Sequence, residues 1–307
     1  MKTLSVVVPV YFNEKSLPTL FLKLRDVEFR LLDEQIKLEL IFVDDGSGDH
    51  SFVELMKIKE QRPDTKVIKL TRNFGAIHAS KTGCRFATGD CFMILAADLQ
   101  DPPELIFQLI EKWKKGSKFT ICTRSTREDP RLTQLFAKVY YWLVRRLVDK
   151  TYPTGGFDIA LMDKTLLPYL INSNKNIYTP LYMYWLGFKP TIIEYHRPKR
   201  PHDHSRWTFK KKITACLNSI LGFSIIPIRL ITATGLLVSL SSMLFAMVII
   251  VNAFLGKFAV PGFPTIVSLI CLLLGLIIVM LGIIGEYLWR TFDSVNARPE
   301  SVIDEIY

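Results

Sequence analysis

Three segments of this 307-residue chain carry acidic and polar residues directly after apolar runs of strand length. They read PVYFNE at 9–14, VDDGS at 43–47 and ADLQDPPE at 97–104. The carboxyl ends of parallel strands face one crevice, and like charges gathered in one crevice repel each other. A divalent cation removes that repulsion, because Mg²⁺ or Mn²⁺ is typically held by one or two carboxylates together with substrate phosphate oxygens. The three segments therefore predict a metal-dependent nucleotide site.

Each segment taken alone has a structural alternative. Asp44–Ser47 could form a plain turn, and Asp101 could cap a helix that has Pro102 in its first turn. Three such segments in one chain favour the site over three unrelated turns. No G-x-G-x-x-G follows the first run, and no G-x-x-x-x-G-K-[ST] occurs. Their absence excludes a dinucleotide-binding dehydrogenase and a P-loop hydrolase.

Strand-length apolar runs alternate with amphipathic segments of helix length over the first 125 residues. The pattern predicts strands at 4–10, 38–43, 66–70, 91–96 and 118–123, and helices at 17–32, 51–61, 76–87 and 103–115. This order predicts an α/β fold, with a mostly parallel sheet flanked by helices and ligands at the carboxyl ends of the strands. Small residues recur every four positions at Gly75, Ala79, Gly83 and Ala87, which predicts a close approach between the third helix and its neighbour.

Two long runs near the C-terminus contain no charged residue, at 230–256 and 258–285. Each exceeds the roughly 20 residues needed to cross a hydrocarbon core. We therefore expect two transmembrane helices, near 229–254 and 265–288. These two runs exclude a simple cytosolic enzyme. The first 228 residues contain no comparable run, which excludes a polytopic transporter.

Basic residues explain much of the net charge of +10 and gather just before the first long apolar run, at Arg197, Lys199, Arg200, Arg206, Lys210, Lys211 and Lys212. Such a cluster indicates contact with anionic lipid and marks the cytoplasmic side, so both termini are expected there. Nucleic acid is the weaker interpretation, because no nucleic-acid-binding motif accompanies the charge. The five cysteines form no C-x-x-C pair, which suits free thiols in a reducing cytoplasm.

Two segments are candidates for helices at a membrane interface. Residues 132–147 combine an apolar face with Lys138, Arg145 and Arg146 and with three neighbouring aromatic residues. An ordinary helix packed on the sheet is the alternative, and the two membrane runs favour the interface. Residues 207–228 form the second candidate, with Lys210–Lys212 near its start.

The motifs together resemble the family 2 inverting glycosyltransferases of GT-A fold, specifically the polyprenyl-phosphate sugar transferases that include dolichyl-phosphate mannose synthase. The resemblance rests on the three segments above, on N-x-G at 73–75, on TGGFDIALMDK at 154–164 and on His204-Ser205-Arg206. Two C-terminal membrane helices are typical of the bacterial branch that loads glucose or a related sugar onto undecaprenyl phosphate.

The resemblance implies a role for particular residues. Nucleotide-sugar binding would fall to Pro9, Tyr11, Glu14, Asp44, Asp45, Ala97, Asp98, Arg124, Arg200 and Arg206. Asp98 and Gln100 would bind Mg²⁺ or Mn²⁺, and the lipid phosphate would contact Arg131, Ser205 and Arg206. Asp158 and Arg124 would be catalytic. Lipid-headgroup contact is the alternative for Arg200 and Arg206.

Two positions depart from the family pattern. The family usually has D-x-D where this chain has Ala96 before Asp98, so the metal has one carboxylate of that pair, and Gln100 or Asp101 would complete the site. The late motif G-E-S-K is replaced by Asp203-His204-Ser205-Arg206, which keeps the positive charge without the lysine geometry.

The resemblance implies four regions: a cytoplasmic GT-A catalytic domain at 1–206, an interfacial helix at 207–228, two membrane helices at 229–288 and a cytoplasmic tail at 289–307. The implied function is inverting, metal-dependent transfer of a hexose, with glucose from UDP-glucose favoured, to undecaprenyl phosphate in the bacterial plasma membrane. Mannose or aminoarabinose transfer to a polyprenyl phosphate is one alternative. A non-catalytic, membrane-anchored nucleotide-sugar-binding scaffold is another, and Ala96 favours it.

Two residue-level expectations complete the prediction. The second pKa of a lipid monophosphate is near 6, so the acceptor is largely a dianion at pH 7 and needs little deprotonation. Asp158 is therefore expected to orient the sugar or an arginine more than to act as a base. In the tail, 301–306 resembles a strand whose backbone groups must pair. The sheet of its own subunit or that of a neighbour could accept it. We expect the neighbour, in a homo-oligomer such as a tetramer, with a frayed terminus as a further alternative.

Overall fold

The computed structural model describes residues 1–124, 131–175, 177–195, 209–255 and 263–307. The chain divides into two compact units. One, here called the sheet unit, comprises Met1–Gly222 together with Pro299–Tyr307, and the other, the helical unit, is Phe223–Arg298. The C-terminal tail therefore belongs to the same unit as the N-terminal strands.

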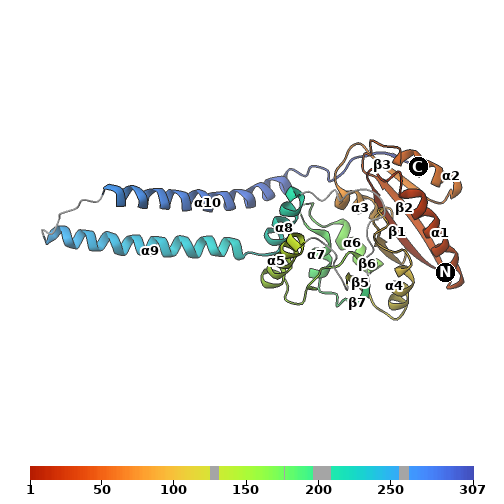
Figure 1. The fold of residues 1–307 in the computed structure, drawn as a ribbon, viewed down its shortest axis with the longest axis horizontal. Helices are drawn as coiled ribbons and strands as arrows, with labels where there is room; N and C mark the ends of the chain where they lie inside the picture. The colour runs from red at the N-terminus through yellow and green to blue at the C-terminus, as the bar shows by residue number, and fades with distance from the viewer. Residues whose placement is uncertain (125–130, 176, 196–208, 256–262) are drawn as a thin grey trace. The chain divides into compact units, whose positions relative to one another are not determined.

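A mixed sheet organises the sheet unit, in the strand order β7-β5-β6-β4-β1-β2-β3-β8 (Figure 1). The strands are β1 (Lys2–Val10), β2 (Ile36–Asp44), β3 (Lys66–Leu70), β4 (Cys91–Ile94), β5 (Phe119–Arg124), β6 (Ile159–Asp163), β7 (Thr191–Tyr195) and β8 (Ile303–Ile306). Strands β4, β1, β2 and β3 run parallel, β6 is antiparallel to both β4 and β5, and β7 is parallel to β5. The carboxyl ends of β1, β2 and β4 consequently share one edge of the sheet.

The first five predicted strands are confirmed, with ends that shift by one or two residues. The sequence did not predict β6 and β7. Four of the five residues of β6 are buried, so its sequence shows no alternation of apolar and polar positions. Strand β7 is short and lies at the edge of the sheet, where it carries a weak pattern.

Helices pack on both faces of this sheet (Figure 1). Helices α1 (Leu17–Asp33), α2 (Ser51–Gln61) and α4 (Leu105–Lys114) lie on one face, and α3 (Ala76–Cys84) lies on the other. The chain then adds α5 (Arg131–Leu147), α6 (Leu167–Ile171), α7 (Thr179–Trp185) and α8 (Phe209–Phe223). Alternate residues of β1 and β2, such as Val6 and Phe42, share one apolar core with α1, α2 and α4. The opposite side chains of these strands, including Val7 and Val43, face α3.

The small residues of α3 permit the close approach that the sequence predicted, and the neighbour is the sheet itself. A Cβ atom added at Gly83 would lie 2.8 Å from Cγ2 of Val43 and would also collide with Val7. Interiors are packed too densely to absorb such a clash. Alanine at position 83 would therefore push α3 away from β1 and β2.

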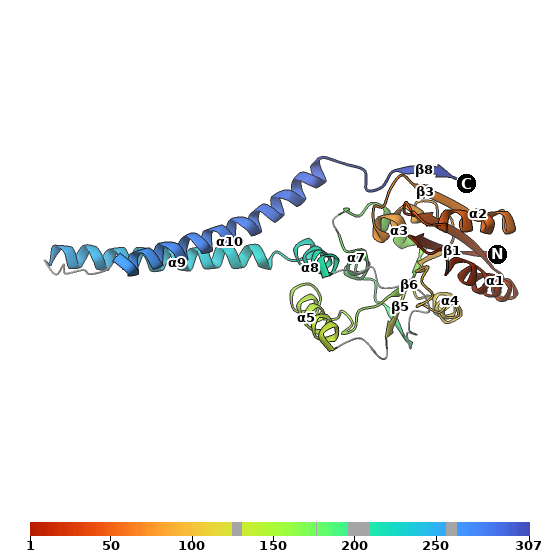
Figure 2. The same cartoon turned by 45° about the horizontal axis from the view of Figure 1, so that its top comes forward.

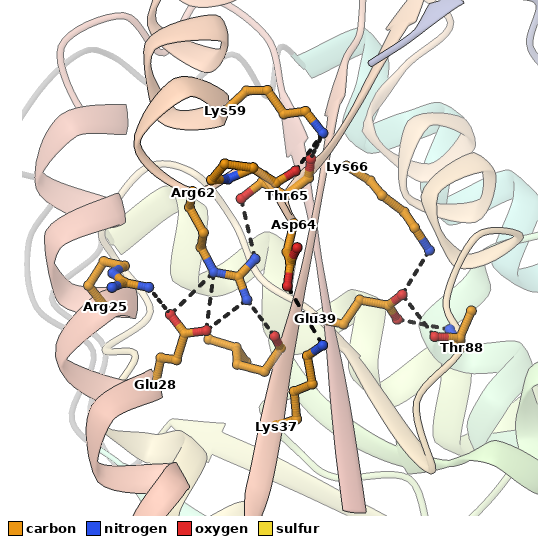
Figure 3. A network of polar contacts seen from close by, with 12 residues as sticks. Arg25, Glu28, Lys37, Glu39, Lys59, Arg62, Asp64, Thr65, Lys66 and Thr88 are labelled. Carbon is orange, nitrogen blue, oxygen red and sulfur yellow. Dashed lines mark hydrogen bonds and ion pairs between the residues drawn. The ribbon is translucent and has the colours of Figure 1, made fainter.

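Two ion-pair clusters tie the layers together on the amino-terminal side of β2 (Figure 3). Arg62 is 6% exposed and donates to Glu28 of α1 at 2.7 Å and to the carbonyl of Leu38 at 2.6 Å. Glu39 accepts hydrogen bonds from Ser5, Lys66 and Thr88. Although burial opposes ionisation of Glu39, these contacts lower its pKa. Both clusters lie away from the carboxyl ends of the parallel strands, so we infer that they stabilise the fold and take no part in the site.

The tail strand β8 pairs antiparallel with β3 of the same chain, with Ile306 opposite Ile68 (Figure 2). Tyr307 and Val67 exchange backbone hydrogen bonds of 2.8 and 3.1 Å. The strand therefore joins the sheet of its own chain, one of the alternatives, instead of the neighbouring sheet that was expected, and the homo-oligomer stays a prediction. Addition to the chain's own sheet satisfies the backbone groups without the entropic cost of association.

The helical unit consists of two long helices, α9 (Ile226–Phe254) and α10 (Phe263–Val295). Both are long and apolar enough to cross a membrane, with mean hydropathies of 1.7 over Ile226–Phe245 and 1.8 over Leu273–Val295. Large apolar side chains such as Met243 and Ile278 are 72% and 68% exposed. In water such apolar surfaces would promote aggregation, whereas lipid chains can cover them without an energetic cost. Helix α9 begins earlier than expected, with Pro227 in its first turn instead of closing the preceding helix.

Helix α5 has the two-sided character predicted for 132–147. Val144 is fully buried, whereas Phe136 and Trp142 are 58% and 63% exposed. The hydroxyl of Tyr140 lies 2.8 Å from that of Ser219, which joins α5 to α8. The exposed aromatic side agrees with a membrane-interface helix, and that role stays a prediction.

Candidate active site

The end of β2 places two buried carboxylates side by side, and the structure gives them different partners. Asp44 accepts a hydrogen bond from the backbone N–H of Ser47 at 3.3 Å, as the turn alternative proposed. The carboxylate of Asp45 instead accepts from the N–H groups of Phe74 at 2.7 Å and Gly75 at 2.9 Å. Burial raises the pKa of Asp44. Asp44 therefore shapes the turn, and Asp45 holds the start of α3.

Gly46 makes this arrangement possible. Its φ is +67°, and a Cβ atom there would lie 2.6 Å from the carbonyl carbon of Arg72 and 2.8 Å from the nitrogen of Asn73. The turn after β2 thus packs directly on the backbone that leads into α3. The VDDGS and N-x-G motifs, which lie far apart in the sequence, form one structural unit here.

The residues after β1 form a loop beside this unit. Pro9 is the second-last residue of β1, and the N–H of Tyr11 donates to the side chain of Asn13 at 3.0 Å. Glu14 accepts from the backbone N–H of His50 at 3.0 Å, and its carboxylate also lies 3.2 Å from the His50 ring nitrogen Nδ1. The loop after β1 is consequently held by the loop after β2.

A tight turn follows β4. Ala97 is buried, Leu99 adopts a left-handed conformation with φ +60°, and the Asp98 carboxylate accepts from the Gln100 N–H at 3.1 Å. Helix α4 begins only at Leu105, with Glu104 as its cap, so Asp101 does not cap it. The helix-start alternative for Asp101 is therefore wrong.

Asp101 instead joins a partly buried polar cluster at the other side of the sheet edge. Arg124, the last residue of β5, donates through Nε and Nη2 to both oxygens of Asp158, with 2.6 Å between Nη2 and Oδ1. The hydroxyl of Tyr195 lies 3.0 Å from Oδ1 of Asp101 and 3.2 Å from Oδ2 of Asp158. A phenol has one proton to donate, so Tyr195 bridges the two carboxylates by donating to one of them at a time.

The electrostatics of this cluster centre on the guanidinium. Burial alone would lower the pKa of Arg124, but the hydrogen bonds and charge of Asp158 raise it above its ordinary value. The pair is bidentate, which fixes the orientation of both groups. Nearby, burial raises the pKa of the Cys122 thiol to about 12, so this cysteine stays protonated and is not a nucleophile.

A pocket of about 230 Å³ opens beside this cluster. Pro9, Ile94, Ala96, Ala160 and Met162 line it from the sheet, and Ala76, Ile77, Ser80, Lys81, Leu170, Thr179, Pro180 and Met183 line it from α3, α6 and α7. Asp101, Phe157 and Asp158 complete the lining. Apolar walls with a few convergent polar groups are typical of small-molecule sites. The pocket thus brings together three predicted regions: the β1 end, the β4 end and Asp158.

The residues near Asp98 fit a divalent cation that takes most of its ligands from the substrate. No group of three or more His, Cys, Asp or Glu side chains could hold a metal among the described residues. Mg²⁺ needs no such cage, because one or two carboxylates plus phosphate oxygens suffice. Asp98 offers one carboxylate, whose Oδ1 accepts a hydrogen bond from the backbone N–H of Gln100 across the left-handed turn at Leu99.

Several predicted residues cannot be placed at this site. Arg200, Ser205 and Arg206 lie outside the described residues, and Arg131 is the first residue of α5, whose side chain is likewise outside the description. Sequence reasoning missed Tyr195 and Lys81. A signal for Tyr195 existed, because it closes an apolar segment just before the basic run.

Several known proteins are similar to this chain in sequence. A family model described as Glycosyl transferase family 2 matches residues 5–175. An uncharacterised glycosyltransferase of Synechocystis sp. is 32% identical over 311 residues, covering 99% of this chain and 95% of that protein. A prophage bactoprenol glucosyl transferase homolog of Escherichia coli is 30% identical over 305 residues, covering 99% of both. The likeness thus extends through the two long helices.

Solved structures share the fold of the sheet unit. Glucosyl-3-phosphoglycerate synthase from Mycobacterium tuberculosis, solved with Mn²⁺, UDP-glucose and phosphoglyceric acid, aligns with a TM-score of 0.52 and 15% identity. The alignment covers 72% of this chain and 80% of that one. At this identity the likeness concerns the fold alone, and it confirms the predicted α/β, GT-A-type architecture.

Proposed function

The chain belongs to glycosyl transferase family 2, and from that premise we propose that it transfers a hexose from a nucleoside diphosphate to undecaprenyl phosphate. Glucose from UDP-glucose is the favoured donor. The observation that most supports this proposal is the full-length match to proteins named bactoprenol glucosyl transferase, which includes the two helices long enough to cross a membrane.

In the proposed acceptor, undecaprenyl phosphate, the nucleophile is a phosphate oxygen. A phosphate monoester is largely a dianion at pH 7, because its second pKa is about 6. One of its oxygens attacks the anomeric carbon, the bond from that carbon to the donor's diphosphate breaks, and the diphosphate leaves with the electron pair. Configuration at the anomeric carbon inverts in this single displacement. No proton has to be removed from the acceptor.

Asp158 is suited to hold Arg124 in place for this reaction. Both carboxylate oxygens already accept hydrogen bonds from the guanidinium, and Tyr195 lies within hydrogen-bonding distance as well. A guanidinium fixed in this way can bind a phosphate on its outward side and stabilise the charge that develops as the diphosphate departs. Arg124 is therefore assigned to phosphate binding and Asp158 to its orientation.

Asp98 and Gln100 are the residues that would hold a divalent cation, either Mg²⁺ or Mn²⁺. When bound, such an ion neutralises the charge of the departing diphosphate. Replacing Asp98 by alanine should lower turnover at least about a hundredfold while leaving the fold intact, because a partly exposed carboxylate contributes little to stability. Near-normal turnover in Asp98→Ala would show that the metal assignment is wrong.

We place the sheet unit and both termini on the cytoplasmic face of the bacterial plasma membrane, with α9 and α10 crossing it. The basic cluster between 197 and 212 supports this orientation, since only Lys257 lies between the two uncharged runs. Anionic lipid is the expected partner of that cluster. A cysteine placed at position 257 should react with an impermeant thiol reagent added outside intact cells, and protection there would reverse the topology.

The test of the proposed reaction uses the full chain in liposomes containing undecaprenyl phosphate. UDP-glucose, GDP-mannose, a UDP-linked aminoarabinose and UDP-N-acetylglucosamine are supplied separately with Mg²⁺ or Mn²⁺, and glycolipid is identified by mass spectrometry. We expect a glucosylated lipid phosphate from UDP-glucose. A different sugar on the lipid would correct the donor, and nucleotide-sugar binding without any release of nucleoside diphosphate would favour the scaffold alternative.

A further inference from the structure

Lys81 is an unusual lysine, because its side chain is only 3% exposed. It lies on α3 and lines the pocket. Its ammonium group donates to the backbone carbonyl of Ser173, just after α6, and to Oε1 of Glu300 at 2.6 Å. A buried charge is tolerated only when it is paired and hydrogen-bonded. The partner that supplies the opposite charge comes from the C-terminal tail.

The tail contacts α3 through side chains that lie close together on that helix. Glu300 also approaches Arg85 at 3.5 Å, and the hydroxyls of Ser301 and Thr82 lie 2.5 Å apart. Glu300 itself is mostly buried, with a side-chain exposure of 14%. Immediately beyond these contacts the tail becomes β8 and adds to β3. The tail is thus fastened both to α3 and to the sheet.

Helix α3 belongs to the site in two ways. Its residues Ala76, Ile77 and Ser80 line the pocket together with Lys81. At its start, the N–H groups of Phe74 and Gly75 hold the carboxylate of Asp45. Any displacement of α3 therefore changes the pocket wall and the orientation of Asp45 at once.

We propose that Lys81 and Glu300 are a positioning pair, through which the tail that follows α10 holds α3 in the geometry needed to bind the nucleotide sugar. The inference rests on the proposed function for the identity of the ligand. Without Glu300, the Lys81 ammonium would keep the Ser173 carbonyl but lose its countercharge, and it would turn toward the pocket that it lines. The tail is then a part of the donor site and not only an edge strand.

The experiment compares substitutions in the full chain by titrating UDP-glucose, and every other nucleotide sugar of the transfer panel, into detergent-solubilised protein. Glu300→Gln preserves the size of the side chain and removes its charge. We expect it to weaken donor binding about tenfold and to change kcat less than about threefold. The matched control is Asp304→Asn in the same tail, since Asp304 pairs with the half-exposed Lys69 and does not reach α3. It should bind the donor within about twofold of the original chain.

A double variant separates positioning from general stabilisation. Lys81→Met combined with Glu300→Gln removes the buried ammonium together with its partner, so it should recover most of the binding that Glu300→Gln alone loses. Hydrogen exchange at residues 74–84 should be faster in Glu300→Gln and normal in Asp304→Asn. Unchanged donor binding and unchanged hydrogen exchange in Glu300→Gln would overturn the inference. Equal losses of donor binding in Glu300→Gln and in the control Asp304→Asn would overturn it as well.

Failure of the proposed function has a different signature. If the unsubstituted chain binds a nucleotide sugar but glycosylates no polyprenyl phosphate, the acceptor is wrong and the binding comparison still tests the tail. If it binds none of the donors, the function is wrong, and hydrogen exchange at 74–84 still decides whether Glu300 fixes α3.

Discussion

Two carboxylates at the same edge of the sheet are held by opposite kinds of partner. Asp45, after β2, accepts from two backbone N–H groups at the start of α3. Asp158, before β6, accepts two hydrogen bonds from the Arg124 guanidinium and lies within hydrogen-bonding distance of the Tyr195 hydroxyl. Backbone amides leave the negative charge of a carboxylate in place, whereas a guanidinium offsets it. The first arrangement suits recognition of a neutral polar ligand, and the second suits a phosphate approaching the arginine.

An aspartate at this edge of the sheet is therefore not automatically a base. A base needs a lone pair directed at the proton that it removes. The described contacts of Asp158 direct both oxygens at Arg124 instead. These contacts suit the orientation of Arg124, and the orienting role of Asp158 stays a prediction.

The largest effect should come from Asp158→Asn, which removes one hydrogen-bond acceptor and the charge that orients Arg124. We expect kcat to fall about a hundredfold, by the same factor from pH 6 to pH 9, because no proton transfer is lost. Release of nucleoside diphosphate measures it. A loss that is severe at low pH and disappears as the pH rises would restore the base role. Arg124→Lys, which keeps the charge without the bidentate geometry, should show a similar loss.

A smaller effect is expected from Tyr195→Phe, which deletes only the hydroxyl between Asp101 and Asp158. The orientation of Asp158 should loosen, so that kcat falls about tenfold while the KM for the lipid phosphate is unchanged. Tyr184→Phe is a matched control, since Tyr184 is also buried and its hydroxyl donates to the Thr151 carbonyl at 2.8 Å. Both changes should cost about 1 kcal/mol of stability. Equal kcat values in the two variants would mean that Tyr195 has no part in the site.

The smallest effect on activity is expected from Asp44→Asn. Asp44 is the neighbour of Asp45, and its carboxylate likewise accepts from a backbone amide, that of Ser47. Burial raises the folded pKa of Asp44, so its contribution to stability is complete below the unfolded value of 3.8 and is lost as the pH rises through the folded value. Asparagine cannot ionise and can still accept from Ser47. At pH 7 the melting temperature should therefore rise by about 2 °C, the usual size for one stabilising substitution, while donor KM rises about threefold.

Thermal unfolding at several pH values checks this last expectation. The advantage of asparagine should shrink as the pH falls toward 3.8. An advantage that stays constant with pH would mean that ionisation of Asp44 costs the folded chain nothing.

Local patterns predicted those strands and helices whose signals are contained in short stretches of sequence. Strands β1 to β5 and helices α1 to α4 each carry their own apolar period and fall close to the expected positions. Arg124 was expected after a strand end and is the last residue of β5. The motifs around Asp45 and Asp98 predicted a shared edge of the sheet, because parallel strands present their carboxyl ends together. Asp158 reaches the same edge at the start of β6, an antiparallel strand that the sequence did not predict.

The contacts that assign roles join distant parts of the chain and have no local signal. The Tyr195 hydroxyl meets Asp101 across 94 positions, and Lys81 meets Glu300 across 219. The sequence left open whether Asp101 caps a helix and which sheet receives β8, because both answers depend on which long-range partner is closest after folding. The fold class, the two membrane-length helices and the sheet edge that bears the acidic motifs can all be read from local sequence patterns. Which carboxylate faces a cation and which faces amides depends on the packing between distant elements, and their spacing along the chain carries no information about that packing.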